Sequence, residues 1–309
     1  MSENLAPIVL FVYNRPWHTR QTLEALMKNE LADESELFIY SDGPKVGASS
    51  EDIQKIEEVR KIIRKERRCK SVIIIERDQN MGLADSIITG VTEIVNRYGK
   101  VIVLEDDLIT SSGFLLFLNN SLMYYNESNS VFGISGFRYP IKSINRVKYN
   151  HFFLPIISSW GWGTWKARWD LIDFSPGLLD KVSNEVNHDN FNFVNHNFFE
   201  ILKKQKEDLL DSWAIYLYSS MFLAEGLFVY PKYSLVKNIG FDQSATHTKV
   251  GYSRFESDFV DYIDIKPQQP SIDQVLNREV RHIGETNLKG LYDEILKKLL
   301  SNFKTRVII

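Results

Sequence analysis

Cysteine, long apolar runs and net charge are all scarce in this sequence of 309 residues. The single cysteine, Cys69, excludes an internal disulfide and a zinc site built from cysteines, and it suits a reducing compartment such as the cytoplasm. No apolar stretch approaches the roughly 18 residues of a membrane-spanning helix, and the first apolar run is too short for a signal peptide. A net charge of -3 provides no basic field for nucleic acid. We therefore expect a cytoplasmic globular protein that has no nucleic-acid partner.

Glycine is absent from the first part of the chain, where Gly43 is the first to occur. A dinucleotide-dependent oxidoreductase needs a GxGxxG motif directly after its first strand, so this class is excluded. A sugar-phosphate nucleotidyltransferase would need a glycine-rich phosphate loop with a basic residue at the same place. The segment FVYNRPWH contains no such loop.

Apolar, β-branched runs alternate with amphipathic segments over the first 110 residues. The pattern predicts strands at 7–13, 36–44, 71–80 and 100–107, with helices between them at 14–29, 51–66 and 81–99. Such alternation is typical of a mostly parallel α/β sheet with helices on both faces. Because no linker separates residues 111–270 from this half, we expect them to pack closely onto it, and the tail 271–309 reads as an amphipathic helix.

Polar residues follow each of the four predicted strands, where ligands of parallel α/β sheets bind. They are Arg15, Asp42, Asn80 with Gly82, and the run Glu105, Asp106 and Asp107. Each has an ordinary alternative when taken alone. The arginine could be a surface residue, SDGP is common turn chemistry, and QNMG could be a plain strand-to-helix connection.

Three adjacent carboxylates close the fourth strand, and they would repel one another without a cation or hydrogen-bond donors. Strand alternation predicts that Glu105 and Asp107 share one side while Asp106 points to the other. Carboxylate oxygens in small number suit Mg²⁺ or Mn²⁺, which substrate phosphates and water complete. The alternative is a solvated acidic turn at the start of the helix that follows, FLLFLNN.

Several segments in this order resemble the nucleotide-sugar glycosyltransferases of the GT-A fold. The closest likeness is to bacterial family-2-like enzymes and to N-acetylglucosaminyltransferases of the type that starts N-glycan branching. The matching segments are PIVLFVYNRPWHTRQTLEAL, SDGP, DQNMGLADSIITGV, VIVLEDDLITSSGFLLFLNNSL, SSWGWGTWKARW and LLDSWAIYLYSSMFLAEGLFVYPKYSLVKNIGFDQSATHT. The resemblance implies a GT-A domain whose residues 1–110 bind the nucleotide sugar and whose residues 111–270 form the acceptor and catalytic half.

The resemblance also implies roles for the strand-end residues. Asp107 would be the protein ligand of a divalent metal, Mn²⁺ or Mg²⁺, that bridges the diphosphate of the donor. Asp106 would hydrogen-bond the ribose and Glu105 a hydroxyl of the donor sugar. Arg15 would contact the diphosphate and Asp42 the nucleotide base, with Asn80 and Gly82 in the adjoining loop.

Three residues of the second half complete the implied site. Asp211 matches the acidic position before a tryptophan in similar enzymes and would be the catalytic base, although an aspartate there could equally be a helix N-cap. His247 lies in a polar loop that could order over the diphosphate. Trp162 could form an aromatic wall for the sugar, or it could belong to the core.

The implied activity is that of an inverting hexosyl- or N-acetylhexosaminyltransferase. It would move a sugar from a nucleotide-sugar donor, a UDP-sugar above all, to a hydroxyl of a glycan or lipid-linked saccharide in surface polysaccharide biosynthesis. A non-catalytic, lectin-like sugar-binding module is the alternative. The C-terminal helix, which carries lysines near its end, could dock on the protein or rest peripherally on the inner face of an anionic membrane.

Overall fold

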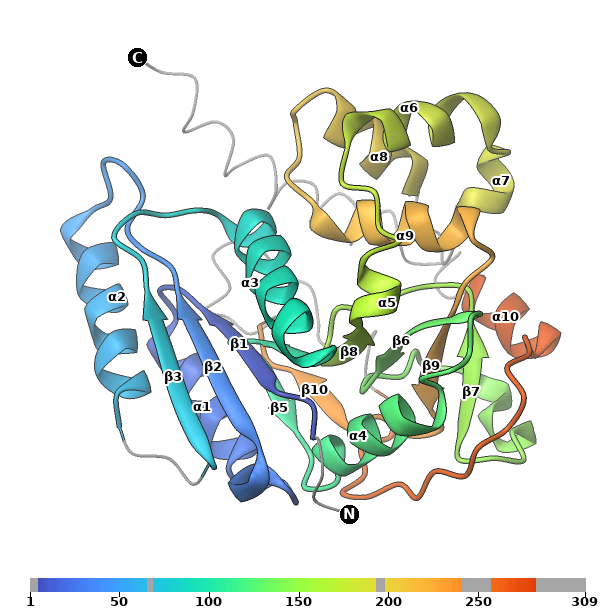
Figure 1. Cartoon of the computed structure of the whole chain (residues 1–309), viewed down its shortest axis with the longest axis horizontal. Coiled ribbons are helices and arrows are strands. Elements are labelled where there is room, and N and C mark those ends of the chain that lie inside the picture. Colours follow the sequence, from blue (N-terminus) through green and yellow to red (C-terminus); the bar gives the residue numbers. More distant parts are fainter. Residues whose placement is uncertain (1–4, 66–68, 193–197, 241–256, 282–309) are drawn as a thin grey trace.

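A computed structural model describes residues 5–65, 69–192, 198–240 and 257–281 of the chain. An eight-stranded sheet forms its centre, in the order β3-β2-β1-β4-β8-β6-β9-β7, and a two-stranded sheet pairs β10 with β5 (Figure 1). Because strands from both halves of the sequence share the large sheet, the halves form one continuous architecture. The predicted α/β fold is confirmed.

The first half of the sheet is parallel and follows the predicted alternation of strands and helices. Its strands are β1 (Ile8–Val12), β2 (Glu36–Ser41), β3 (Ser71–Glu76) and β4 (Lys100–Glu105). Its helices are α1 (Pro16–Leu26), the 3-10 turn η1 (Ala32–Glu34), α2 (Ser50–Ile63) and α3 (Leu83–Tyr98). Pro16 fixes the first turn of α1, and Gly99, at φ 80°, ends α3 in the left-handed conformation.

The second half adds short strands and a group of helices. The strands are β5 (Leu108–Thr110), β6 (Val131–Ser135), β7 (His151–Leu154), β8 (Trp162–Trp165), β9 (Leu227–Pro231) and β10 (Val236–Asn238). The helices are α4 (Phe114–Tyr124), the 3-10 turn η2 (Lys142–Arg146), α5 (Lys166–Trp169), α6 (Pro176–Glu185), α7 (His188–Phe191), α8 (Phe198–Lys206), α9 (Trp213–Leu223) and α10 (Gln274–Arg281). Here β8 runs antiparallel between β4 and β6, and β7 is antiparallel to β9.

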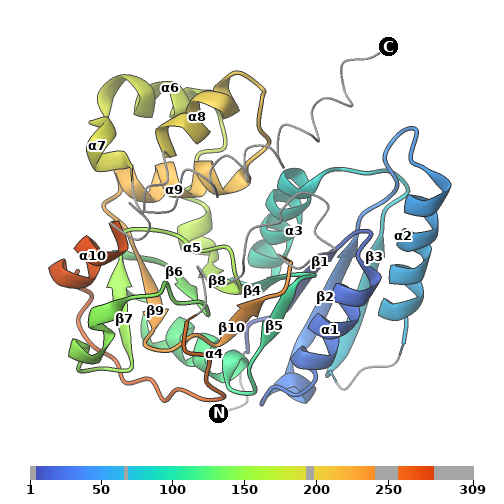
Figure 2. The ribbon, with the colours of Figure 1, turned by 180° about the vertical axis from the view of Figure 1, so that it is seen from behind.

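Two apolar layers cover the faces of the sheet, because successive residues of each strand point to opposite sides. Val9 and Phe11 of β1 belong to one apolar cluster with residues of α3, α6 and α9, whereas Ile8 and Leu10 belong to a second cluster with residues of α1, α2 and α4. Figures 1 and 2 show α6, α7, α8 and α9 gathered together beyond α5. Within the described ranges, no helix is long and apolar enough to cross a membrane.

Candidate active site

The carboxyl ends of β2, β1 and β4 lie side by side, because β1 pairs in parallel with both neighbours. The register places Val12 beside Ser41 and Phe11 beside Glu105. Arg15 therefore follows the central strand of the three, with Asp42 on one side of it and the three acids on the other.

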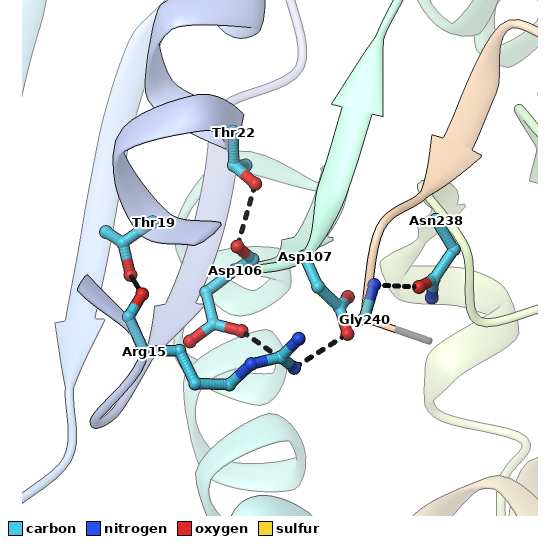
Figure 3. Close-up of polar contacts among 7 residues, drawn as sticks. All are labelled: Arg15, Thr19, Thr22, Asp106, Asp107, Asn238 and Gly240. Carbon is cyan, nitrogen blue, oxygen red and sulfur yellow. Dashed lines mark hydrogen bonds and ion pairs between the residues drawn. The ribbon is translucent and has the colours of Figure 1, made fainter. Parts of the chain in front are cut away.

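Arg15 lies between the carboxylates of Asp106 and Asp107 (Figure 3). Its Nη1 atom is 2.8 Å from Oδ2 of Asp107 and 3.6 Å from Oδ1 of Asp106. Its Nη2 atom is buried and has no hydrogen-bond partner within the described part of the chain. The guanidinium of Arg15 thus contacts two carboxylates through Nη1, while its Nη2 remains available as a hydrogen-bond donor.

The structure differs from the strand-alternation prediction for Asp106. Strand β4 ends at Glu105, and a turn begins at Asp106 before β5 starts at Leu108. In the turn the alternation no longer holds, so both aspartates reach the same arginine. The acids also do not cap α4, whose N-cap is Gly113 and has no side-chain cap.

The charges of this cluster shift two pKa values. Burial raises the pKa of Asp106 to about 7, which Arg15 opposes and Asp107 reinforces. Burial lowers the pKa of Arg15, but Asp106, Asp107 and Glu105 outweigh it, so the net pKa lies above its ordinary value. Glu105 is therefore close enough to act on the same guanidinium.

Two further contacts fix the acidic turn, and sequence reasoning missed both. Thr22 of α1 donates its hydroxyl to the backbone oxygen of Asp106 at 2.8 Å. Gly240 packs against Asp107 so closely that a Cβ at that glycine would lie 2.1 Å from Oδ2 of the carboxylate. The glycine belongs to the segment GFDQSATH, which carried part of the family resemblance, and this was the available signal.

The donor set of this turn fits a divalent metal that is shared with a substrate. Within the described ranges, no group of three His, Cys, Asp or Glu side chains could hold a metal alone. A Mg²⁺ site needs only one or two carboxylates of the protein when substrate phosphates supply other ligands. Asp107 offers a carboxylate oxygen beyond the one that Arg15 contacts, and the unpartnered Nη2 of Arg15 suits a phosphate oxygen.

Asp42, at the end of β2, organises the loop between β3 and α3. Its two carboxylate oxygens accept hydrogen bonds from the backbone N–H groups of Gly43, Met81 and Gly82 and from the side chain of Asn80, at 2.9–3.1 Å. The structure thus brings Asp42, Asn80 and Gly82 together. Their contact with a nucleotide stays a prediction.

Asp211 lies against the same loop, across from Gly82. A Cβ at Gly82 would be 3.5 Å from Oδ2 of Asp211. The N-cap of α9 is Ser212, and Asp211 comes directly before it. The predicted base is therefore next to the predicted donor loop.

Trp162 lies in the core, which is the alternative that the sequence left open, and its contact with a donor sugar stays a prediction. Its side chain is 1% exposed and stacks between Trp169, at 6.0 Å, and Trp213, at 5.2 Å between ring centroids. Gly163 of β8 allows a close approach to β4, since a Cβ there would lie 3.0 Å from the backbone oxygen of Val101. His247 and residues 282–309 of the tail lie outside the described residues.

No family model and no curated protein matches the chain. Among solved structures, it resembles a mannosyltransferase from Pyrobaculum calidifontis in complex with GDP-Man and Mn²⁺, at 12% identity and a TM-score of 0.39 over 71% of this chain and 74% of that one. It also resembles an active-site mutant of LgtC, at 10% identity and a TM-score of 0.40 over 72% of each chain. Mouse xyloside xylosyltransferase 1 matches at 9% identity and a TM-score of 0.33 over 72% and 83% of the two chains. Likeness at this level carries no information on activity, which rests on the site itself.

Proposed function

We propose that this chain is a metal-dependent, inverting glycosyltransferase. One observation carries the proposal: at the carboxyl edge of a parallel sheet, Arg15 is held by Asp106 and Asp107 with a buried donor atom left over. An arginine with a spare donor beside carboxylates provides both halves of a site for a metal-bound diphosphate. The donor is a nucleotide sugar, and we take a UDP-sugar as the first candidate.

The residues of the acidic turn bind and orient the donor in this proposal. Arg15 holds the diphosphate, Asp106 the ribose and Glu105 a hydroxyl of the sugar. Asp107 would hold Mn²⁺ or Mg²⁺, which would supply positive charge to the departing diphosphate. Orientation of this kind lowers the barrier because the reacting atoms are already in place.

Asp211 acts as the general base. It takes the proton from an acceptor hydroxyl while that oxygen bonds to the anomeric carbon and the bond from this carbon to the diphosphate oxygen breaks. Attack from the side opposite the diphosphate inverts the anomeric carbon. The acceptor is a glycan or lipid-linked saccharide, in surface polysaccharide biosynthesis at the cytoplasmic side of a membrane.

Nucleotide binding separates this proposal from a lectin-like module. We expect UDP with Mn²⁺ to raise the melting temperature by a few degrees, because a ligand that binds only the folded state stabilises it. A lectin would bind glycans and leave the melting temperature unmoved by the nucleotide. A screen of UDP-, GDP- and dTDP-sugars for hydrolysis with Mn²⁺ then identifies the donor.

Two substitutions divide binding from chemistry. Asp107→Ala removes a charged ligand of the donor site, so metal-dependent UDP binding should disappear. Asp211→Asn should keep UDP binding and lose transfer, because its amide cannot accept the proton. Asp170→Asn is the control, since that exposed carboxylate pairs with Lys166 on α5. Transfer by Asp211→Asn at the wild-type rate would exclude this residue as the base.

A further inference from the structure

All acceptor sites of the Asp42 carboxylate are engaged within the chain. Oδ1 accepts from the N–H of Gly43 at 3.0 Å and of Met81 at 2.9 Å. Oδ2 accepts from Nδ2 of Asn80 at 2.9 Å and from the N–H of Gly82 at 3.1 Å. A carboxylate offers about four lone-pair sites, which equals the number of these hydrogen bonds. Asp42 is also buried, with 8% of the residue exposed. A nucleobase would have to displace one of these four donors.

The conformation of Gly82 depends on this carboxylate. Its φ of 82° and ψ of 164° belong to a region that only glycine occupies readily. Its N–H group is bound to Asp42, and its carbonyl accepts the N–H of Ser86 at 3.1 Å as α3 begins. Asp42 therefore fixes the backbone at the point where the loop becomes helix.

Asp211 lies between the loop at Gly82 and the start of α9. On one side, Oδ2 lies 3.5 Å from the place where a Gly82 Cβ would be. On the other side, α9 starts at Trp213, whose ring stacks on Trp162 at 5.2 Å and an interplanar angle of 17°. A Cβ at Gly82 would touch this carboxylate at an ordinary van der Waals distance, so glycine is required here by its φ of 82° and not by lack of space.

We propose that Asp42 and Gly82 are positioning residues for the base Asp211, and that Asp42 acts through the loop instead of reading the nucleobase. This inference rests on the proposed function, in which Asp211 takes the acceptor proton. Four internal hydrogen bonds hold the loop in one conformation, and that conformation sets where the carboxylate of Asp211 lies relative to the donor.

Gly82→Ala tests the placement of the base. The substitution adds a methyl group beside the Asp211 carboxylate and strains the backbone. We expect kcat for sugar transfer to fall 10- to 100-fold and the acidic limb of its pH profile to shift, while the affinity for UDP with Mn²⁺ stays within about threefold. A wild-type kcat and pH profile in Gly82→Ala would overturn the inference.

Asp42→Asn tests the same idea without a new side-chain volume. An asparagine keeps one acceptor oxygen and turns an NH₂ group toward N–H donors, so the loop loses its anchor. We expect kcat to fall at least 10-fold while the ratio of UDP to GDP affinity, measured with Mn²⁺, stays within twofold. A tenfold change in that ratio would show that Asp42 reads the base.

A matched control is Asp273→Asn at the start of α10, where the carboxylate accepts the N–H groups of Val275 and Leu276. It should leave kcat unchanged, since this carboxylate binds the first turn of α10. Wild-type protein that fails to bind UDP with Mn²⁺ refutes the proposed function. If the wild type transfers sugar and both Gly82→Ala and Asp42→Asn keep the wild-type kcat, only the positioning inference is refuted.

Discussion

Gly240→Ala should disable the donor site and leave the fold intact. A Cβ at this position would lie 2.1 Å from Oδ2 of Asp107 and 2.9 Å from Nη2 of Arg15. The N–H of Gly240 is held by Asn238 at 2.7 Å and the preceding N–H, of Ile239, by the carbonyl of Asp107 at 2.8 Å, so the backbone cannot easily withdraw. The carboxylate, which is the end of a flexible side chain, would have to rotate away from the arginine.

The expected cost is that of one charge-assisted hydrogen bond, the 2.8 Å contact from Arg15 to Asp107, or about 1.5–3 kcal/mol. If the donor site uses that arrangement, UDP with Mn²⁺ should bind roughly 10- to 150-fold more weakly. Isothermal titration calorimetry measures this change directly.

The matched control is Gly177→Ala in α6, where the nearest atom to a new Cβ is Oγ of Ser175 at 3.5 Å, an ordinary contact. Alanine is the better helix former, so this variant should fold at least as well and bind UDP with wild-type affinity. A Gly240→Ala protein that binds UDP with Mn²⁺ within twofold of the wild type would refute the assignment of Asp107 to the donor site.

Three further substitutions or conditions test the core and the site. Burial lowers the pKa of His151 from 6.5 to about 4, so folding favours the neutral form, and this residue should contribute a loss of roughly 3 kcal/mol as the pH falls from 6.5 to 4. The raised pKa of Asp106 acts in the opposite direction in both proteins, so the test is the difference between wild type and His151→Phe in urea unfolding at the two pH values. Gly133→Ala would place a Cβ 2.5 Å from the Phe228 ring, and overpacking of this kind should cost about 1–3 kcal/mol in urea unfolding. Trp162→Phe keeps a ring in the stack and loses no hydrogen bond to the described residues, among which the indole Nε1 has no partner, so KM for the donor should stay constant; a raised KM would place Trp162 in the donor site.

The first half of the fold could be predicted because the residues within each strand and helix are enough to identify it. Strand β1 is a continuous β-branched run, and α1 begins at Pro16, so both could be placed within three residues of their ends. These strands also pair with neighbours in a regular parallel arrangement, which the alternation of strands and helices implies.

The second half could not be predicted in the same way. Strand β8 contains Gly163 between two tryptophans, which shows no clear strand period, and it enters the sheet between β4 and β6 with antiparallel pairing. Strand β6 likewise contains Gly133 and lies in a segment that reads as a glycine-aromatic region. Their places are decided by packing with distant residues, which a local pattern does not contain.

The candidate site shows the same division. The types of residue at the strand ends could be found from the sequence, and the structure brings Arg15, Asp106 and Asp107 into contact. The direction of the Asp106 side chain could not be predicted, because it depends on the residue at which β4 ends. If β4 continued through Asp106, strand alternation would point this carboxylate to the side opposite Glu105. The approach of Gly240 was hidden for the same reason, since it joins segments more than 130 positions apart.

The acidic turn also explains why the donor should need a metal. Asp106 and Asp107 both contact Arg15, and Glu105 acts on the same guanidinium, so several carboxylates gather around this arginine. A diphosphate adds further negative charge at this place, and like charges a few ångströms apart repel one another. A divalent cation bound with the diphosphate removes this repulsion and uses the carboxylate of Asp107 as a ligand. The unpartnered Nη2 of Arg15 can then bind a phosphate oxygen while Nη1 stays with the acids. Repulsion between these carboxylates and the diphosphate should thus make UDP binding depend on the metal. An equal UDP affinity with Mn²⁺ and with EDTA would contradict this expectation.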